Sequence, residues 1–129
     1  MRNKAEFETV VSTLRAILEP YASKLVVVSD TSNSYYLDTT HIMKNKKPLF
    51  FAAVRMGKNY VSFHLMPVYA CPGLPNNVSP ELKKRMQGKS CFNFTSVDEK
   101  LFKELAKLTK AGFAKFSDEK FVSALRTLQ

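Results

Sequence analysis

Four side chains able to bind a ligand lie on two apolar segments joined by Met56-Gly57-Lys58-Asn59. Phe51 and Arg55 precede this turn, and Tyr60 and His64 follow it, each pair at a spacing of four that shares one face of a strand. A guanidinium holds an anion through charge-assisted hydrogen bonds, aromatic rings stack on planar groups, and an imidazole changes charge near neutral pH. We therefore predict that these side chains bind a small anionic ligand.

Two further residues are assigned to this predicted site. Tyr69 lies in the proline-containing connection 67–78, whose apolar residues indicate that it packs down over the hairpin. Lys89 belongs to Gly88-Lys89-Ser90, which matches the end of a phosphate-binding loop, but position 83 is lysine where that motif needs glycine. Lys89 is therefore expected to bind an anion only as a lone charge, and Gly88 to end a helix.

Enzymatic chemistry is a separate alternative, in which His64 and Cys71 form a nucleophilic pair. The sequence holds no local signature of such a pair, so no catalytic residue is assigned. The His and Cys residues also lack the close spacings that are typical of zinc sites, and neither a metal nor a cofactor is predicted.

The chain is strongly basic, with a net charge of +9 from 20 Lys and Arg against 11 Asp and Glu. The stretch 39–80 contains no acidic residue. A stripe of lysines at spacings of three and four follows Asp98, namely Lys100, Lys103, Lys107 and Lys110. Such a surface attracts polyanions through counterion release, so we expect weak and nonspecific association with nucleic acid.

The fold expected from these patterns is α+β. The chain of 129 residues is 45% hydrophobic, as in one globular domain, which excludes disordered, collagen-like and coiled-coil classes. Hydrophobic periodicity predicts a helix over 3–19, hairpins over 25–38 and 49–66, a helix over 79–88, a strand over 91–94, a long helix after 98 and a final helix from 117. The predicted order, α-β-β-β-β-α-β-α-α, gives a largely antiparallel sheet of about five strands with helices packed on one face.

In the second hairpin, a two-residue Gly57-Lys58 loop pairs Val54 with Val61 on an apolar face that turns toward the core and also holds Phe50. This register leaves three apolar side chains on the opposite face: Leu49, Phe51 and Met66. Because exposed apolar area favours association, the alternative to a ligand site is a homodimer that uses this face as its interface.

The segments Gly57-Lys58-Asn59-Tyr60-Val61-Ser62-Phe63-His64 and Gly88-Lys89-Ser90-Cys91-Phe92-Asn93-Phe94 resemble the YdhG-like family of small bacterial proteins. The similarity covers residues 48–115, whereas 39–45 departs from the tyrosine-glycine-methionine-proline segment of that family. It implies a single YdhG-like domain over 1–129 with a frataxin-like fold, and iron handling by analogy. Iron would need a carboxylate-rich surface, but the first helix offers only Glu6, Glu8 and Glu19, with Arg15 among them, and the whole chain is cationic.

The expected compartment is the cytoplasm. Basic residues begin the chain, but Glu6 and Glu8 interrupt the apolar core that a secretion signal requires. No apolar run approaches the roughly 20 residues of a membrane helix. Cys71 and Cys91 are too few for a disulfide framework, and both are expected to be free thiols. The sequence thus predicts a cytoplasmic binding or interaction module that does not enter membranes.

Overall fold

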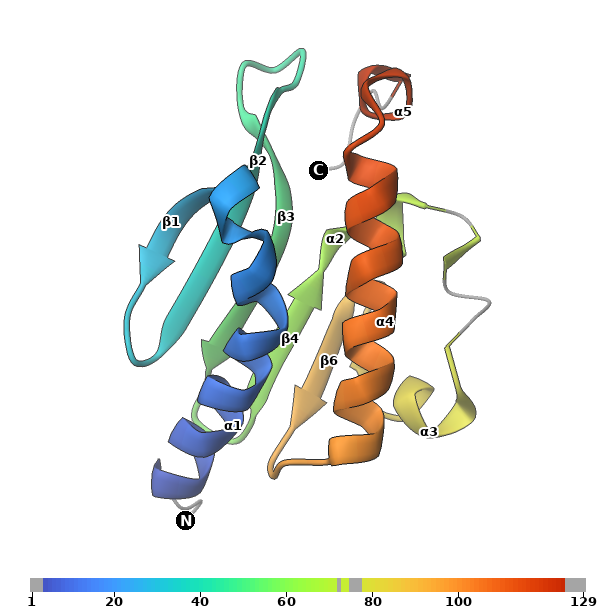
Figure 1. Ribbon diagram of the computed structural model, residues 1–129. Coiled ribbons are helices and arrows are strands. Elements are labelled where there is room, and N and C mark those ends of the chain that lie inside the picture. Colours follow the sequence, from blue (N-terminus) through green and yellow to red (C-terminus); the bar gives the residue numbers. More distant parts are fainter. Residues whose placement is uncertain (1–3, 72, 75–77, 125–129) are drawn as a thin grey trace.

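A six-stranded antiparallel sheet runs through the computed structural model, which describes residues 4–71, 73–74 and 78–124 (Figure 1). The strands are β1 Val26–Asp30, β2 Ser34–Ile42, β3 Pro48–Met56, β4 Val61–Leu65, β5 Met86–Gln87 and β6 Cys91–Phe94, in the spatial order β1-β2-β3-β4-β6-β5. The helices are α1 Lys4–Leu18, the 3-10 helix η1 Glu19–Lys24, α2 Met66–Ala70, α3 Pro80–Lys83, α4 Glu99–Phe116 and α5 Glu119–Ala124. The predicted α+β class is confirmed.

Helices α1 and α4 lie against the same face of the sheet (Figure 1). In α1 the apolar residues at spacings of three and four turn inward and are buried: Phe7, Val10, Val11, Leu14 and Leu18. Strands β2 and β4 alternate between buried residues that face the helices and half-buried residues on the opposite face. The sheet therefore has one covered face and one face open to solvent.

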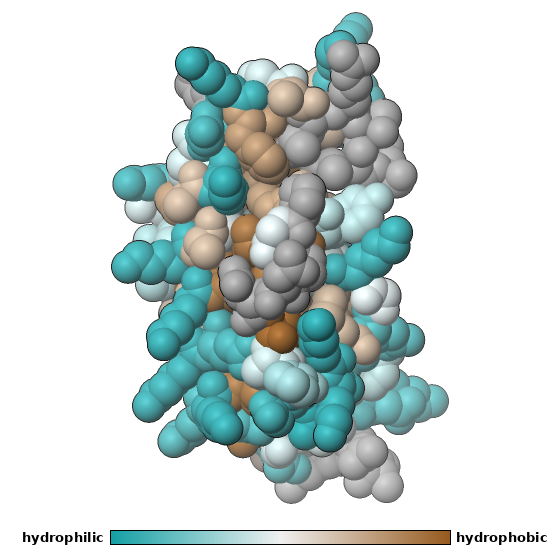
Figure 2. Space-filling view, turned by 90° about the vertical axis from the view of Figure 1, so that its right-hand side faces the viewer, coloured by the Kyte–Doolittle hydropathy of each residue, from teal (hydrophilic) through white to brown (hydrophobic). Residues whose placement is uncertain are grey.

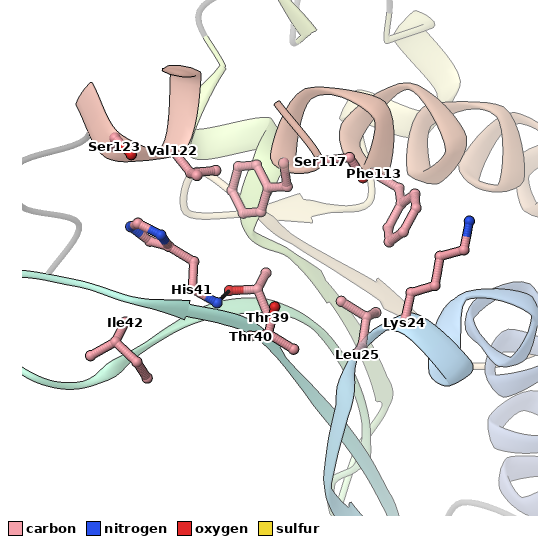
Figure 3. Close-up of a pocket in the computed structure, with 11 residues that line it drawn as sticks. Lys24, Leu25, Thr39, Thr40, His41, Ile42, Phe113, Ser117, Val122 and Ser123 are labelled. Atoms are coloured by element: carbon pink, nitrogen blue, oxygen red, sulfur yellow. Dashed lines mark hydrogen bonds between the residues drawn. The ribbon is translucent and has the colours of Figure 1, made fainter. Parts of the chain in front are cut away.

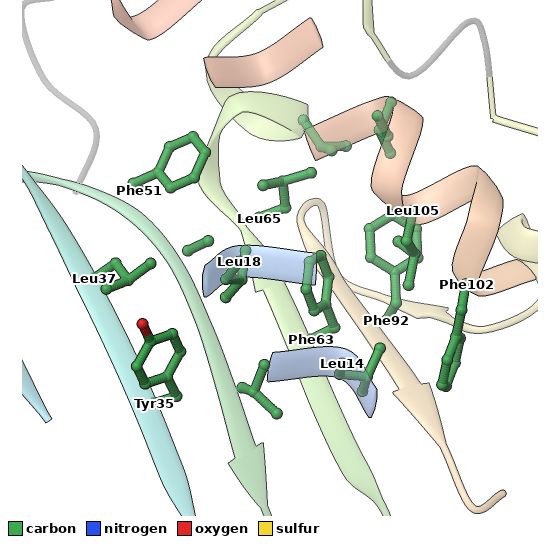
Figure 4. Close-up of a cluster of buried hydrophobic side chains, with 14 of the residues drawn as sticks. Leu14, Leu18, Tyr35, Leu37, Phe51, Phe63, Leu65, Phe92, Phe102 and Leu105 are labelled. Carbon is green, nitrogen blue, oxygen red and sulfur yellow. The ribbon is translucent and has the colours of Figure 1, made fainter. Parts of the chain in front are cut away.

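The core fills the space between the sheet and the two long helices (Figure 4). Phe63 from β4 and Phe92 from β6 are fully buried there, together with Leu14 of α1. Phe94 meets Phe102 of α4 edge to face, with ring centroids 4.8 Å apart. Burial of these large side chains stabilises the contact between the sheet and both helices.

A β-bulge in β3 changes which phenylalanine faces the core. Leu37 pairs with Ala52, but the next residue of β2, Asp38, pairs with Phe50, so Phe51 is an extra residue in β3. Phe51 is consequently 0% exposed, while Phe50 turns to the open face. The predicted orientation of both rings is wrong, because simple alternation does not contain the inserted residue.

The turn of the β3–β4 hairpin also lies one residue later than predicted, which shifts the strand register by two residues. Val54 pairs with Phe63 rather than Val61, and the Gly57 N–H donates to the Tyr60 carbonyl at 2.8 Å, so Lys58 and Asn59 form the turn. This register pairs Met56 with Val61, and Met56 packs against the core. A slip of two residues keeps every side chain on its face, so Val54 and Phe63 remain buried as predicted.

Two segments differ from their predicted structure. The connection after β4 begins with the helix α2, and residues 72 and 75–77 of that connection lie outside the described part of the chain. The predicted helix over 79–88 ends at Lys83, after which Met86 pairs with Phe92 and Gln87 with Cys91. Gly88, at φ +76°, therefore turns a hairpin instead of capping a helix.

The described helices include none that is both long enough and apolar enough to cross a membrane.

Candidate functional site

A groove of about 640 Å³ crosses the open face of the sheet. We call it the outer groove. Its lining comes from β2, β3, β4, β6 and the turn before β2, and consists of Asn33, Ser34, Tyr36, Ala53, Arg55, Met56, Ser62, His64 and Cys91. Arg55 and His64, two of the predicted binding residues, therefore share one depression.

The strand register explains the hollow. Ala53 pairs with Tyr36 on one side and with His64 on the other, so a methyl group lies between two larger rings. In the neighbouring row, Arg55 pairs with the small Ser62. Directly opposed side chains on adjacent strands lie about 5 Å apart, and a small residue between large ones leaves room for a ligand atom.

One end of the outer groove is aromatic. The Tyr36 and Phe50 rings stack with centroids 4.7 Å apart and an interplanar angle of 29°. Phe50 in turn meets the His64 ring edge to face, with centroids 5.0 Å apart. These contacts hold the rings in fixed orientations, and a planar group entering the groove meets Tyr36 and His64 at its border.

Arg55 supplies positive charge in the outer groove. Its side chain is exposed, and the ion pairs found among the described residues belong to Arg15, which contacts Glu19 and Asp30. The Arg55 guanidinium thus has no carboxylate partner within the described residues. A free guanidinium offers donors in a fork that fits carboxylate or phosphate oxygens.

A chain of hydrogen bonds borders the groove on the side of β5 and β6. The Ser62 hydroxyl donates to Asn93 Oδ1 at 2.8 Å, and Asn93 Nδ2 donates to Gln87 Oε1 at 2.7 Å. The Tyr60 hydroxyl donates to the same Gln87 oxygen at 3.4 Å. These hydrogen bonds fix the Ser62 side chain, which lines the outer groove.

Partial burial shifts the pKa values of the groove residues toward their neutral forms. Desolvation lowers the pKa of His64 and raises the pKa of the Cys91 thiol, although a hydrogen bond with Ser62 opposes the latter shift. Desolvation also raises the pKa of Tyr36. At neutral pH, His64 is therefore an uncharged hydrogen-bonding ring, and Arg55 carries the positive charge.

The other predicted binding residues lie outside the outer groove. Phe51 is buried beneath the sheet, with its ring centroid 5.7 Å from that of Phe113, so its assignment to a ligand site is wrong. Tyr60 lines a neighbouring hollow next to Gln87. It is linked to the outer groove only through its hydrogen bond with Gln87. Tyr69 and Lys89 form a pair of their own, with Lys89 Nζ 5.5 Å from the Tyr69 ring centroid.

Cys71 is not the cysteine beside His64. Cys71 is 2% exposed and packs in the core, and burial raises the pKa of its thiol. The cross-strand partner of His64 is Cys91. Desolvation favours the protonated thiol of Cys91 and the neutral imidazole of His64.

Sequence reasoning missed Tyr36, Phe50 and Cys91. Tyr36 carries a detectable signal, because it alternates with the buried Tyr35 and Leu37 in a strand already expected to pair in this sheet. Cys91 alternates in the same way with Phe92. Phe50 carries no such signal, because its orientation depends on the bulge.

A second cavity of about 450 Å³ lies between the end of β2 and the junction of α4 with α5 (Figure 3). His41, Ser117 and Ser123 line it, together with the Phe113 and Phe116 rings. Ser117 is the C-cap of α4, so the carbonyl end of that helix meets the cavity. Lys24 also lines this cavity, which contains none of the predicted binding residues.

Hydrophilic side chains project from the flank shown in Figure 2. The four lysines of the α4 stripe are exposed. Glu104, which lies among them, accepts hydrogen bonds from the Ser79 N–H at 2.7 Å and from the Ser79 hydroxyl at 2.6 Å. Its carboxylate therefore ties α4 to the start of α3.

No group of three or more His, Cys, Asp or Glu side chains able to hold a metal ion occurs in the part of the chain that the structure describes. No family model, curated protein or solved structure matches this chain.

Proposed function

We propose that this protein is a small binding module whose outer groove takes an anionic ligand that carries a planar group. The observation that carries the proposal is the position of Arg55, a guanidinium without an ion-pair partner among the described residues, in the same groove as the Tyr36 and His64 rings. Arg55 binds the anionic group, the rings contact the planar group, and Ser62 donates or accepts a hydrogen bond.

The same geometry argues against the open face as a homodimer interface. That alternative depended on apolar area at Leu49, Phe51 and Met66. Leu49 and Phe51 are buried in the core, and Met66 packs against the core. The groove that remains is lined by serine, arginine and histidine beside its aromatic end, a composition suited to a small polar ligand.

Three compounds form a suitable probe set. Phenyl phosphate carries both the anionic group and the ring, inorganic phosphate carries the anion alone, and phenol carries the ring alone. Binding is followed by amide chemical shifts in NMR and by calorimetry. We expect phenyl phosphate to bind more tightly than either partial probe and to shift the amides of residues 34–36, 53–55 and 62–64. Binding outside these segments contradicts the proposed site.

The matched variants are Arg55→Gln and Lys58→Gln, each of which removes one exposed cation. A charge-assisted hydrogen bond contributes about 1.5–3 kcal/mol, so Arg55→Gln is expected to weaken phenyl phosphate binding by about tenfold or more. Lys58→Gln, in the adjacent turn, should leave it nearly unchanged. Equal losses in the two variants indicate that only the net charge attracts the anion.

We also propose that the chain is a cytoplasmic YdhG-like domain. The hairpin with Gly57, the hairpin with Gly88 and the long helix α4 keep the order on which that resemblance rests. Cys71 and Cys91 are both free, as is usual for a reducing compartment.

A further inference from the structure

The second cavity, between the end of β2 and the junction of α4 with α5, has an aromatic wall that the core holds in place (Figure 3). Phe113 and Phe116 of α4 form this wall. The Phe113 ring centroid lies 4.8 Å from that of Tyr21. The Phe116 ring centroid lies 6.1 Å from that of Phe51. Because these contacts already fix both rings, a ligand that packs against them orders little of the protein on binding.

Aliphatic side chains complete the apolar lining of the second cavity. Leu25, Ile42 and Val122 contribute them. Ile42 is 57% exposed, so part of this apolar area faces water. A ligand with an apolar body that covers it removes that area from water. The volume of about 450 Å³ lies in the range of small-molecule sites, about 300–1,000 Å³.

Lys24 is the one charged residue among the described residues that line the second cavity. It ends η1, and in Figure 3 its side chain extends from η1 toward α4. The carboxylates of η1 and β1, on Glu19 and Asp30, both contact Arg15. Lys24 therefore has no ion-pair partner within the described part of the chain, and its ammonium is available to an anion.

No carboxylate lines the second cavity in the described part of the chain. Asp118, at the junction of α4 with α5, accepts hydrogen bonds from the N–H groups of Lys120 and Phe121 at 3.0 and 3.3 Å. Its carboxylate is thus engaged at the start of α5. The remaining polar lining consists of serine, threonine and histidine side chains, which offer hydrogen bonds.

The carboxyl end of α4 also meets the second cavity, and its carbonyls have partners within the chain. The Phe113 carbonyl accepts from the Ser117 N–H at 2.9 Å, and the Lys115 carbonyl accepts from the Asp118 N–H at 3.1 Å. A ligand therefore does not have to supply hydrogen-bond donors for these carbonyls.

We propose that the second cavity binds a small monocarboxylic acid with an apolar body. Lys24 pairs with the carboxylate, and the apolar body packs against Phe113 and Phe116. The ammonium of lysine is a point charge that balances one negative charge. A phosphate monoester carries about −1.5 to −2 at pH 7, so phenyl phosphate fits this cavity less well than a carboxylate does. The second cavity and the outer groove share no lining residue among those described, so the two sites are separate.

Hexanoate, hexanol and hexylamine test the class of ligand, because they share one apolar chain and differ in charge. We expect hexanoate to bind most tightly and hexylamine least tightly. In NMR titrations, hexanoate should shift the amides of residues 24–25, 39–42 and 122–123, and its chain should show NOEs to the Phe113 and Phe116 rings. The proposal is overturned if hexanoate binds no more tightly than hexanol, binds elsewhere or shows no saturable binding.

Lys24→Gln and Lys44→Gln are matched variants, since each removes one exposed lysine and only Lys24 lines the second cavity. Loss of an exposed ion pair should weaken hexanoate binding in Lys24→Gln by about threefold to fivefold. Hexanol binding should stay unchanged in this variant. Lys44→Gln should bind both compounds as wild type does. Equal hexanoate affinities in the two variants overturn the role of Lys24 and with it the proposal.

The outer groove and the second cavity are tested independently. Arg55→Gln should weaken phenyl phosphate binding but not hexanoate binding, and Lys24→Gln should leave phenyl phosphate binding unchanged. Loss of hexanoate binding in Arg55→Gln places the carboxylate in the outer groove and overturns the second site. A wild type that binds hexanoate at Lys24 but no phenyl phosphate contradicts only the outer groove.

Discussion

At the scale of single residues, the neighbours Phe50 and Phe51 have opposite environments. Phe51 packs among Tyr21, Phe113 and Phe116, with ring centroids at 6.3, 5.7 and 6.1 Å. Phe50 packs on the open face between Tyr36 and His64. One inserted residue in β3 separates a side chain of the core from a side chain of the open face.

Phe51→Ala should destabilise the protein by about 3–5 kcal/mol, because it leaves a cavity that the surrounding rings cannot fill. Phe50→Ala should have a clearly smaller effect, since its ring is only partly buried. Urea denaturation of both variants measures the difference. Equal losses of unfolding free energy in the two variants contradict the bulge in β3.

His64 should make stability depend on pH. Its pKa is lowered in the folded state by burial, so the unfolded chain takes up the proton first as the pH falls. The stability that His64 contributes is full above its unfolded pKa of about 6.5 and decreases between that value and the lower folded pKa. Unfolding free energies from pH 7.5 to 5.5 should therefore fall less in His64→Gln than in wild type. His41→Gln serves as the control.

At the scale of elements, α2 and α4 make a close contact at Gly112. A Cβ atom at this position would lie 2.6 Å from Pro67 Cβ and 2.9 Å from Pro67 Cγ. The rigid proline ring cannot move aside as a flexible side chain would. Glycine is therefore required inside α4 although it is a poor helix former.

Gly112→Ala should lower stability by about 1–3 kcal/mol despite the gain in helix propensity. Gly73→Ala is the control, since among the described residues, apart from Gly73 and its chain neighbours, no heavy atom lies within 4 Å of its added Cβ. Thermal unfolding of the two variants compares them directly. A stabilised Gly112→Ala variant shows that α2 and α4 are not in close contact.

The hydrophobic periodicity of the sequence was sufficient to predict the elements that bury many residues. Helices α1 and α4 and strand β4 follow their predicted faces because each carries a repeated apolar pattern. Strand β5 is too short to show a period, and its existence depends on pairing with β6. Helix α2 is similarly short and begins at Met66-Pro67. Partners distant in the sequence determine such elements.

The candidate site was predictable in part for the same reason. Arg55 and His64 reach the open face because strand alternation holds on the turn side of the bulge. Beyond the bulge alternation fails, so Phe51 replaced Phe50 in the predicted set. Tyr69 and Lys89 meet each other through the approach of α2 to the β5–β6 turn, which no local pattern specifies.

At the scale of the whole molecule, the charge of +9 should produce salt-dependent binding to polyanions. We expect retention on heparin at low ionic strength and elution near physiological salt, because bound counterions are released on binding. Replacing Lys103, Lys107 and Lys110 with Gln should lower the salt concentration at elution. Tight binding with sequence preference for one nucleic acid contradicts this prediction.

Phe51 is synthesised well before two of the aromatic residues that it packs against. Strands β1 to β4 and helix α1 are complete at Leu65, but Phe113 and Phe116 lie near the end of α4. At about 5–20 residues per second, several seconds of synthesis separate them. During that interval the nascent sheet has Phe51 without two of its aromatic neighbours, and a cell must shield this face from other nascent chains until α4 arrives.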